Sequence, residues 1–250
     1  MEQSNRLAGG LLAFVMGLAM LGATGCTGMR HAEAPLPAPG FPTPTVEGGE
    51  SWWVYRFRID WPEGMPADKA VDLLLAHAVV KPSLERFAPR LTYWRFHRRA
   101  ARDAAGHQFS LLFYSDPATA GALYAALDAS PVLAQVRAQG LVTRIIKDDP
   151  QNPVRPGIAD TSDPHWSPML QRQWPAYIMG VSLLWLGLID EAVAELPPEQ
   201  KADDDLLADY RAVDERITRL WYKEGQHAFL HHLSAVFGYH EMLIVKPMRF

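Results

Sequence analysis

The stretch SWWVYRFRID, residues 51–60, decides the fold class of this chain, because its apolar and charged side chains alternate. Trp53, Tyr55, Phe57 and Ile59 fall on one side of an extended chain, and two arginines and an aspartate fall on the other. A period of two residues is typical of a strand with one buried face. The stretch therefore predicts a half-buried strand at the start of a folded body.

Further strands and helices follow in an order that defines an α+β fold. Apolar residues at helical spacing predict a helix near 67–80, and alternation predicts strands at 91–98, 107–115 and 141–147. Another helical stretch lies between the last two strands. The order β-α-β-β-α-β is that of a ferredoxin-like sandwich, in which helices cover one face of an antiparallel sheet. We therefore predict a ferredoxin-like domain over residues 51–148, followed by a helical C-terminal half.

Part of this region resembles a known family. The segments LLLAHAVVKPSLERF and YWRFHRRAARDAAGHQFSLLF, within residues 70–115, are similar to the thiopeptide-type bacteriocin biosynthesis domain, the C-terminal region of lantibiotic dehydratases. Arg98 and His107 stand at matching places of that pattern. The family carries arginines in the strand after the histidine, where this sequence has apolar residues: Phe109, Leu111 and Phe113. The resemblance implies the fold and does not imply elimination chemistry.

A basic hairpin near residues 95–102 is a candidate anion-binding site. The residues that could contact an anion or a phospholipid headgroup are Arg95, Arg98, Arg99 and His107. The alternative is a solvated hairpin tip, because charged side chains are mostly exposed.

The N-terminus has the pattern of a secretory signal peptide, residues 1–26. A short polar start with one arginine precedes fifteen uncharged residues and a small-residue stretch that ends at Cys26. That stretch resembles the lipobox of bacterial lipoproteins, which implies cleavage before Cys26 and covalent lipid on the cysteine. The alternative is a cytosolic protein with an apolar N-terminus. Cys26 is the only cysteine, so lipidation would leave no thiol for disulfides, catalysis or metal binding.

Residues 27–50 contain five prolines and no periodic apolar pattern, and we interpret them as a tether. A polyproline-like chain of this length reaches up to about 70 Å. The expected location is the bacterial cell envelope, anchored by lipid and facing the periplasm. Thr27 follows the cysteine where an aspartate would indicate inner-membrane retention, and the resemblance to that sorting rule favours the outer membrane.

A proline-rich linker, residues 149–164, precedes a helical region at 165–250. Pro168 and Pro175 predict the first turns of two successive helices. The uncharged run at 176–189 is short for a membrane span and predicts a buried core helix. The alternative is an apolar patch that meets a partner or lipid.

Histidines near the C-terminus form a second candidate site. Glu224, His227 and His231 are spaced to share one helix face, and together with His165 they could bind zinc or iron as a metal site or an active site. Gly225 predicts a helix break, which would place the histidines on a solvent-facing or partner-facing surface. An unbroken helix would instead continue the buried stripe of the preceding helix.

The formal charge of −4 gives no basic excess for nucleic acid, and the chain has no phosphate-binding glycine loop or GxSxG motif. We assign no catalytic residue and expect no cofactor beyond the covalent lipid. The leading hypothesis is a non-enzymatic, lipid-anchored binding or scaffold module for an envelope protein or a small apolar ligand. The alternative is a small envelope enzyme or metal-binding protein that uses the histidine and glutamate cluster.

Overall fold

A computed structural model describes residues 49–100, 105–152, 154–196 and 206–239, which belong to one compact unit, Pro44–Phe250. The signal peptide, Cys26, nearly all of the tether, His240 and the apolar tail after it lie outside these ranges. The predictions made for those segments stay predictions.

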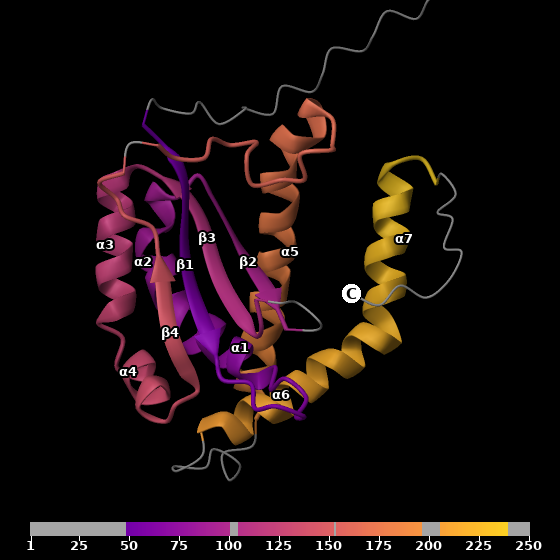
Figure 1. Ribbon diagram of the computed structural model, residues 1–250. Coiled ribbons are helices and arrows are strands. Elements are labelled where there is room, and N and C mark those ends of the chain that lie inside the picture. Colours follow the sequence, from indigo (N-terminus) through magenta and orange to yellow (C-terminus); the bar gives the residue numbers. More distant parts are fainter. Residues whose placement is uncertain (1–48, 101–104, 153, 197–205, 240–250) are drawn as a thin grey trace, which may run out of the picture. The chain divides into compact units, whose positions relative to one another are not determined.

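Four strands form one antiparallel sheet in the order β2-β3-β1-β4. The strands are β1 (Ser51–Ile59), β2 (Tyr93–Arg99), β3 (Gln108–Ser115) and β4 (Val142–Lys147). With helical connections after β1 and after β3, this order confirms the ferredoxin-like α+β fold and the helical second half (Figure 1).

The helical connections are subdivided. After β1 come α1 (Ala70–Leu74), a π-helical turn η1 (Leu75–Val80), α2 (Lys81–Phe87) and a 3-10 turn η2 (Ala88–Arg90). Between β3 and β4 lie α3 (Pro117–Asp128) and α4 (Pro131–Ala138). The second half contains α5 (Pro168–Ala194), α6 (Leu206–Leu220), a π-helical turn η4 (Trp221–Gly225) and α7 (Gln226–Val236).

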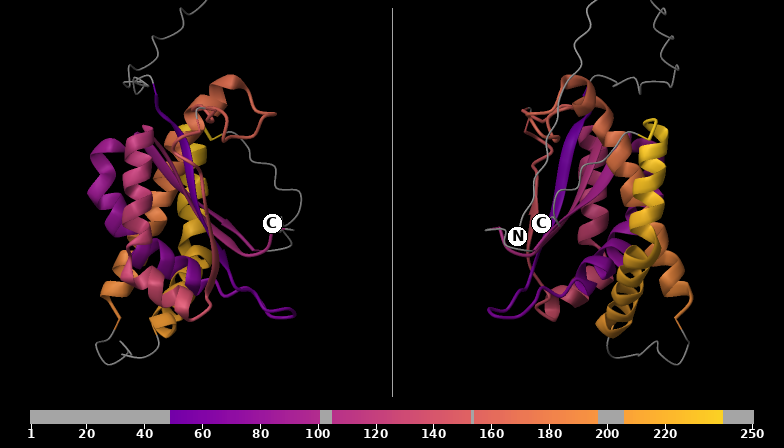
Figure 2. Two further views of the ribbon diagram at one scale, coloured as in Figure 1. Left: turned by 60° about the vertical axis from the view of Figure 1, so that its left-hand side comes forward. Right: turned by 90° about the vertical axis from the view of Figure 1, so that its right-hand side faces the viewer.

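The alternation of β1 places its aromatic side chains in the core. Trp53, Tyr55 and Phe57 are buried with the leucines of α1 and η1, on the face of the sheet that helices α1–α4 cover (Figures 1 and 2). The opposite face, called the outer face below, carries Arg56 and Arg58 from the same strand. Because side chains of a strand alternate between faces, the sequence pattern alone fixes this division.

Helix α5 covers the edge of the sheet at β2. Oγ of Ser182 accepts a hydrogen bond from the backbone N–H of Phe96 at 3.1 Å, and the ring of Trp185 contacts the ring of Phe96 edge-on. An exposed edge strand would offer unpaired N–H and C=O groups to another chain. The helical half therefore completes the sheet, and α5 and α6 contribute to its core: Leu186, Ile189, Ala192, Leu207, Tyr210 and Val213.

The prediction of two helices starting at Pro168 and Pro175 is wrong, because α5 runs through both prolines as one helix of 27 residues. Ser167 caps its first turn by accepting from the N–H of Leu170, and Pro168 is the first helical residue, where its missing N–H costs nothing. Pro175 is buried inside the helix. Inside a helix, a proline removes one backbone hydrogen bond and its ring crowds the preceding turn. We infer that the packing of Pro175 outweighs this local cost.

Candidate functional site

A buried polar network joins α1 to strands β2 and β3. Oδ2 of Asp72 accepts a hydrogen bond from Nε of Arg98 at 2.7 Å, and Oδ1 of Asp72 lies 2.8 Å from Nε2 of His107. The side chains of Asp72 and His107 have no exposed surface, and that of Arg98 is 31% exposed. A buried carboxylate requires such partners, because leaving it unpaired would cost several kcal/mol.

This network is closed rather than poised to bind. Nδ1 of His107 is buried and has no hydrogen-bond partner among the described residues. The guanidinium of Arg98 lies 5.0 Å from the ring centre of Trp185, which extends the network to α5. Since the histidine is closed to solvent, a soluble ligand has no access to it, and the arrangement fixes the sheet against α1 and α5.

The four residues of the predicted anion site do not gather at one place. Arg98 and His107 meet at Asp72 on the helix-covered face, where the carboxylate neutralises the arginine. Arg95 and Arg99 belong to the outer face, because residues of β2 alternate between faces. Nη2 of Arg95 donates to the carbonyl oxygen of Thr161 at 2.9 Å, so its charge serves to hold the linker segment.

Sequence reasoning missed Asp72. Its available signal was an acidic residue within the run KAVDLLLAHAVV, whose other members from Ala70 onward are apolar except for one histidine. A charged residue in such a run is almost never fully buried unless it is paired. The partners lie 26 and 35 residues away, and only folding identifies them.

A second polar network holds the helical half to η1 and α2, in the helical connection after β1. Nδ1 of His77 lies 2.7 Å from Oη of Tyr210 on α6, and its Nε2 lies 3.3 Å from Oδ1 of Asp190 on α5. Lys81 Nζ lies 2.9 Å from Oδ2 of Asp190. Burial raises the pKa of Tyr210 to about 12 and lowers the pKa of His77 below its ordinary value, so the imidazole favours its neutral form.

A cavity of about 490 Å³ lies where the loop after β1, the start of α1 and α6 meet. Charged residues in its lining include Lys69 on the loop side and Asp214 on α6, and an ion pair between Asp68 and Arg211 adds to its wall. Burial lowers the pKa of Lys69 and raises the pKa of Asp214. Both shifts favour the neutral forms. A neutral amine can accept a proton as a base, and a neutral carboxylic acid can donate one as an acid.

The predicted metal or active site is exposed and its members come from three different segments. His165 lies in the loop before α5, where its backbone N–H donates to Asp163, and its side chain is exposed. Glu224 lies in η4, and His227 and His231 lie on α7 with ring centres 5.2 Å apart. Among the described residues, no three or more His, Cys, Asp or Glu side chains are arranged to hold a metal ion.

The prediction of a helix break at Gly225 is wrong. Gly225 has φ −61° and ψ −41°, both helical, and the chain passes from α6 through the π-helical turn into α7. A Cβ atom at this glycine would lie 3.0 Å from Cε3 of Trp221 and 3.1 Å from Cε2 of Phe229. The glycine therefore leaves room for the rings of Trp221 and Phe229 and does not end the helix. His227 and His231 are nevertheless exposed, because α7 has no buried residue.

Helix α5 carries a second apolar stripe on the side away from its buried residues. We call this stripe the outer seam, and its members follow one another at intervals of four, three, four, three and four residues: Leu170, Trp174, Tyr177, Val181, Leu184 and Leu188. Tyr177, Val181 and Leu184 are exposed by 42 to 48%. This spacing keeps side chains on one helix face and is the spacing of coiled-coil seams.

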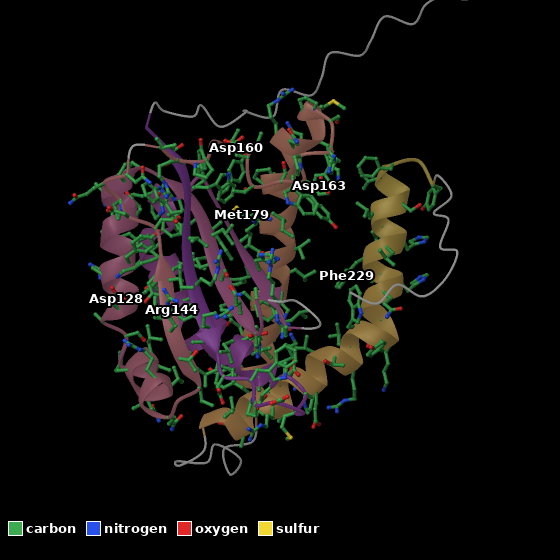
Figure 3. The ribbon with its side chains drawn as sticks, in the orientation of Figure 1. Asp128, Arg144, Asp160, Asp163, Met179 and Phe229 are labelled. Carbon is green, nitrogen blue, oxygen red and sulfur yellow. The ribbon has the colours of Figure 1, made fainter. Side chains whose placement is uncertain are left out.

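No charged residue occurs in α5 between Arg172 and Asp190. The helix is the one described helix long and apolar enough to cross a membrane by length and composition, and 22% of its most apolar window is buried. Helix α7, whose Phe229 is labelled in Figure 3, also exposes large apolar residues: Leu230 and Val236, with Phe237 directly after it. An exposed apolar area of this extent is typical of an interaction surface.

Comparison with known proteins gives distant structural neighbours only. No family model matches the sequence, and no curated protein matches it. The solved structures that match include TsrL, at 15% identity over 76% of this chain and 49% of TsrL, with a TM-score of 0.35. This chain therefore spans about half the length of TsrL.

Two smaller structures each align over less than half of this chain. A hydroxynitrile lyase from Passiflora edulis matches at 13% identity over 41% of this chain and 92% of its own, with a TM-score of 0.26. A dimeric ferredoxin-like protein of unknown function from Thermobifida fusca matches at 12% identity, over 42% of this chain and 92% of its own, with a TM-score of 0.25. At these TM-scores the likeness carries no argument about activity.

Proposed function

We propose that the protein is a non-enzymatic, lipid-anchored binding module of the bacterial envelope, and that its outer seam receives an apolar helix of an envelope protein. The observation that carries this proposal is the spacing of the outer seam together with the exposure of its central members, Tyr177, Val181 and Leu184. The core of the domain does not require these side chains, because α5 packs on the sheet through its other side.

The chemistry of the surface favours a protein partner over a small apolar ligand. Small apolar ligands bind in enclosed apolar cavities, whereas the outer seam is a convex helix face. A second helix can bury such a face by placing its own side chains between those of the seam. Val181 and Leu184 are 42% and 43% exposed, so complete burial of either would contribute about half of the 1.5 to 3 kcal/mol of a fully exposed side chain, before the costs of association.

The anchor part of the proposal rests on the N-terminal sequence. Lipid on Cys26 and the tether would hold the folded body within about 70 Å of a membrane, with the outer membrane favoured. Confinement to one membrane raises the effective concentration of a partner in that membrane. A moderate affinity of the outer seam for its partner helix would then be enough to form the complex.

Photocrosslinking in cells tests the seam. A benzoylphenylalanine residue at position 184 should give a discrete crosslinked product, whereas the same residue at position 183 should not. Leu183 is the matched control, since it is exposed by 51% compared with 43% for Leu184 but lies off the seam. Val181→Glu should abolish the product at 184. Equal products at both positions, or none at 184, would contradict the proposal.

A second candidate function is enzymatic, and the cavity beside Lys69 and Asp214 favours it. Perturbed pKa values of an amine and a carboxyl at one cavity are typical of sites that transfer protons. Structural ion networks produce the same shifts, and Asp72 and Arg98 lie close enough to influence both groups. The reactivity of Lys69 toward amine reagents, compared with that of Lys81, tests this candidate.

A further inference from the structure

Two adjacent rows of side chains on the outer face of the sheet are strongly basic. The pairing register gives both rows, which cross β2, β3, β1 and β4 in that order: Arg99, Gln108, Arg58 and Arg144 in the first, and His97, Ser110, Arg56 and Ile146 in the second. Four of these eight residues are arginines and none is acidic. The chain as a whole is acidic, with a formal charge of −4, so the positive charge is segregated here.

Three of these arginines, Arg56, Arg58 and Arg144, form what we call the arginine cluster. Within the described part of the chain, none of their guanidinium groups forms a hydrogen bond or an ion pair. The carboxylate in the next row, Asp148, already accepts hydrogen bonds from the backbone N–H of Val54 and from Arg155. No carboxylate among the described residues therefore neutralises the cluster.

This arrangement costs stability in the free protein. Arg58 lies directly opposite Arg144 in the β1–β4 pairing (Arg144 is labelled in Figure 3). Like charges directly opposite each other across two strands repel and destabilise the sheet. Opposite charges at these two positions would instead stabilise the pairing of the strands.

The linker segment covers the other end of the outer face. The carbonyl oxygen of Ile158 accepts from Nε1 of Trp52 at 3.1 Å, and that of Thr161 accepts from Arg95 at 2.9 Å. Among described residues, these contacts stop one row short of the arginine cluster. The linker segment therefore occupies one end of the outer face, and at the other end the arginine cluster has no ion-pair partner among the described residues.

We propose that the arginine cluster binds a phosphate-bearing ligand. Neighbouring strands lie about 4.8 Å apart, so the long side chains of Arg58 and Arg144 can reach one oxyanion from two sides. One guanidinium group can donate two parallel hydrogen bonds to two oxygens of a phosphate, whereas the ammonium group of a lysine acts as a point charge. A soluble phosphate compound and a phospholipid headgroup share this chemistry.

The test uses residues 27–250, which contain the whole compact unit Pro44–Phe250 and carry no lipid that would itself bind vesicles. Calorimetric titration with inorganic pyrophosphate measures binding of soluble phosphate, and flotation with phosphatidylcholine vesicles, with or without phosphatidylglycerol, measures binding to headgroups. The variant R58Q/R144Q removes two cations, and R137Q removes an exposed arginine of α4 as the matched control. The double variant should lose about tenfold or more in affinity, and the control should keep the wild-type value.

The outcomes separate the sources and decide the proposal. Pyrophosphate binding that R58Q/R144Q weakens assigns a soluble phosphate ligand, and binding only to phosphatidylglycerol vesicles assigns a lipid headgroup. The double variant should melt no lower than wild type, because a repulsion has been removed. Absence of both kinds of binding, equal binding by the double variant, or loss of binding with a lowered melting temperature would overturn the proposal. None of these results depends on the outer seam of α5.

Discussion

Nε2 of His107 lies 2.8 Å from Oδ1 of Asp72, and both side chains are fully buried between the sheet and α1. Nε of Arg98 occupies the other carboxylate oxygen at 2.7 Å. Asp72 lies in α1, Arg98 lies in β2, and His107 directly precedes β3. This network therefore links α1 to the sheet in the interior of the protein.

Removal of the carboxylate should be strongly destabilising. Asp72→Ala leaves Arg98 and His107 without their shared partner, and breaking a buried ion pair in this way costs about 3 to 5 kcal/mol. Urea unfolding followed by circular dichroism measures the free energy of unfolding. Glu63→Ala is the control, since Glu63 is exposed, and it should change that free energy by less than about 0.5 kcal/mol. Equal effects of the two substitutions would refute the network's structural role.

The environment of His77 predicts a pH dependence of stability. Burial lowers its pKa below the ordinary value of 6.5, and the cation of Lys81 acts in the same direction, while Asp190 opposes both. Below pH 6.5 the unfolded chain then binds more protons at this site than the folded chain, so the free energy of unfolding falls as pH falls.

His77→Gln should remove that contribution. The difference in urea midpoint between pH 7.5 and pH 5.5 should be smaller in the variant than in wild type, even if the variant is less stable at both pH values because it loses the contact with Tyr210. Other titrating groups affect both proteins alike. An unchanged or larger pH dependence in His77→Gln would show that this histidine is not held neutral.

The continuity of the helix at Gly225 can be tested by substitution. Gly225→Ala should maintain or increase helix content, because alanine is favoured over glycine by about 1 kcal/mol in a helical backbone. Contact of the new Cβ with Trp221 and Phe229 reduces this gain, and both rings have exposed surface into which they can turn. Gly238→Ala is the contrasting case, since Gly238 has φ +82° and disfavours a side chain. Circular dichroism should show an unchanged or higher helix content in Gly225→Ala and a lower one in Gly238→Ala. A loss of helix content in Gly225→Ala would instead support a helix break at Gly225.

Lys69 should be the more reactive of two lysines toward amine reagents. Burial lowers its pKa below 10.5, whereas the hydrogen bond from Lys81 to Asp190 raises the pKa of Lys81 above that value. Labelling with a small anhydride at a series of pH values, read by mass spectrometry, should therefore give a lower midpoint for Lys69. In Asp214→Asn the midpoint of Lys69 should fall further, because the carboxylate of Asp214 favours its charged form. A midpoint at or above that of Lys81 would argue against the enzymatic candidate.

Lipid attachment is tested at Cys26. Palmitate labelling in a bacterial host should mark the wild-type chain and not Cys26→Ala, since no other cysteine is present. The variant should also leave the membrane fraction. Continued labelling of Cys26→Ala would refute the anchor, while the seam and arginine-cluster experiments would remain interpretable.

The sheet was predictable because its signal is local. The alternation of Trp53, Tyr55 and Phe57 with charged residues determines which face of β1 is buried, whatever the rest of the chain does. The order of strands and helices then admits few topologies, and the ferredoxin-like order is the one observed.

The candidate sites were less predictable, because their contacts join residues far apart in the chain. The sequence predicts Arg98 and His107 as members of an anion site, whereas in the structure both contact the buried carboxylate of Asp72. The run of basic residues in 95–99 also alternates between the two faces of the sheet, which its composition alone does not reveal. Arg144 becomes a neighbour of Arg58 only through the β1–β4 pairing.

The sequence by itself determined the face pattern of the strands, the fold class and the candidate lipid anchor, since each rests on side chains close together in the chain. Only the tertiary structure decided which apolar stripe of α5 is buried and which forms the outer seam, because both stripes have helical spacing and composition cannot rank them. It also decided the path through Pro175 and Gly225, where packing of surrounding side chains outweighs a local preference of about 1 to 3 kcal/mol.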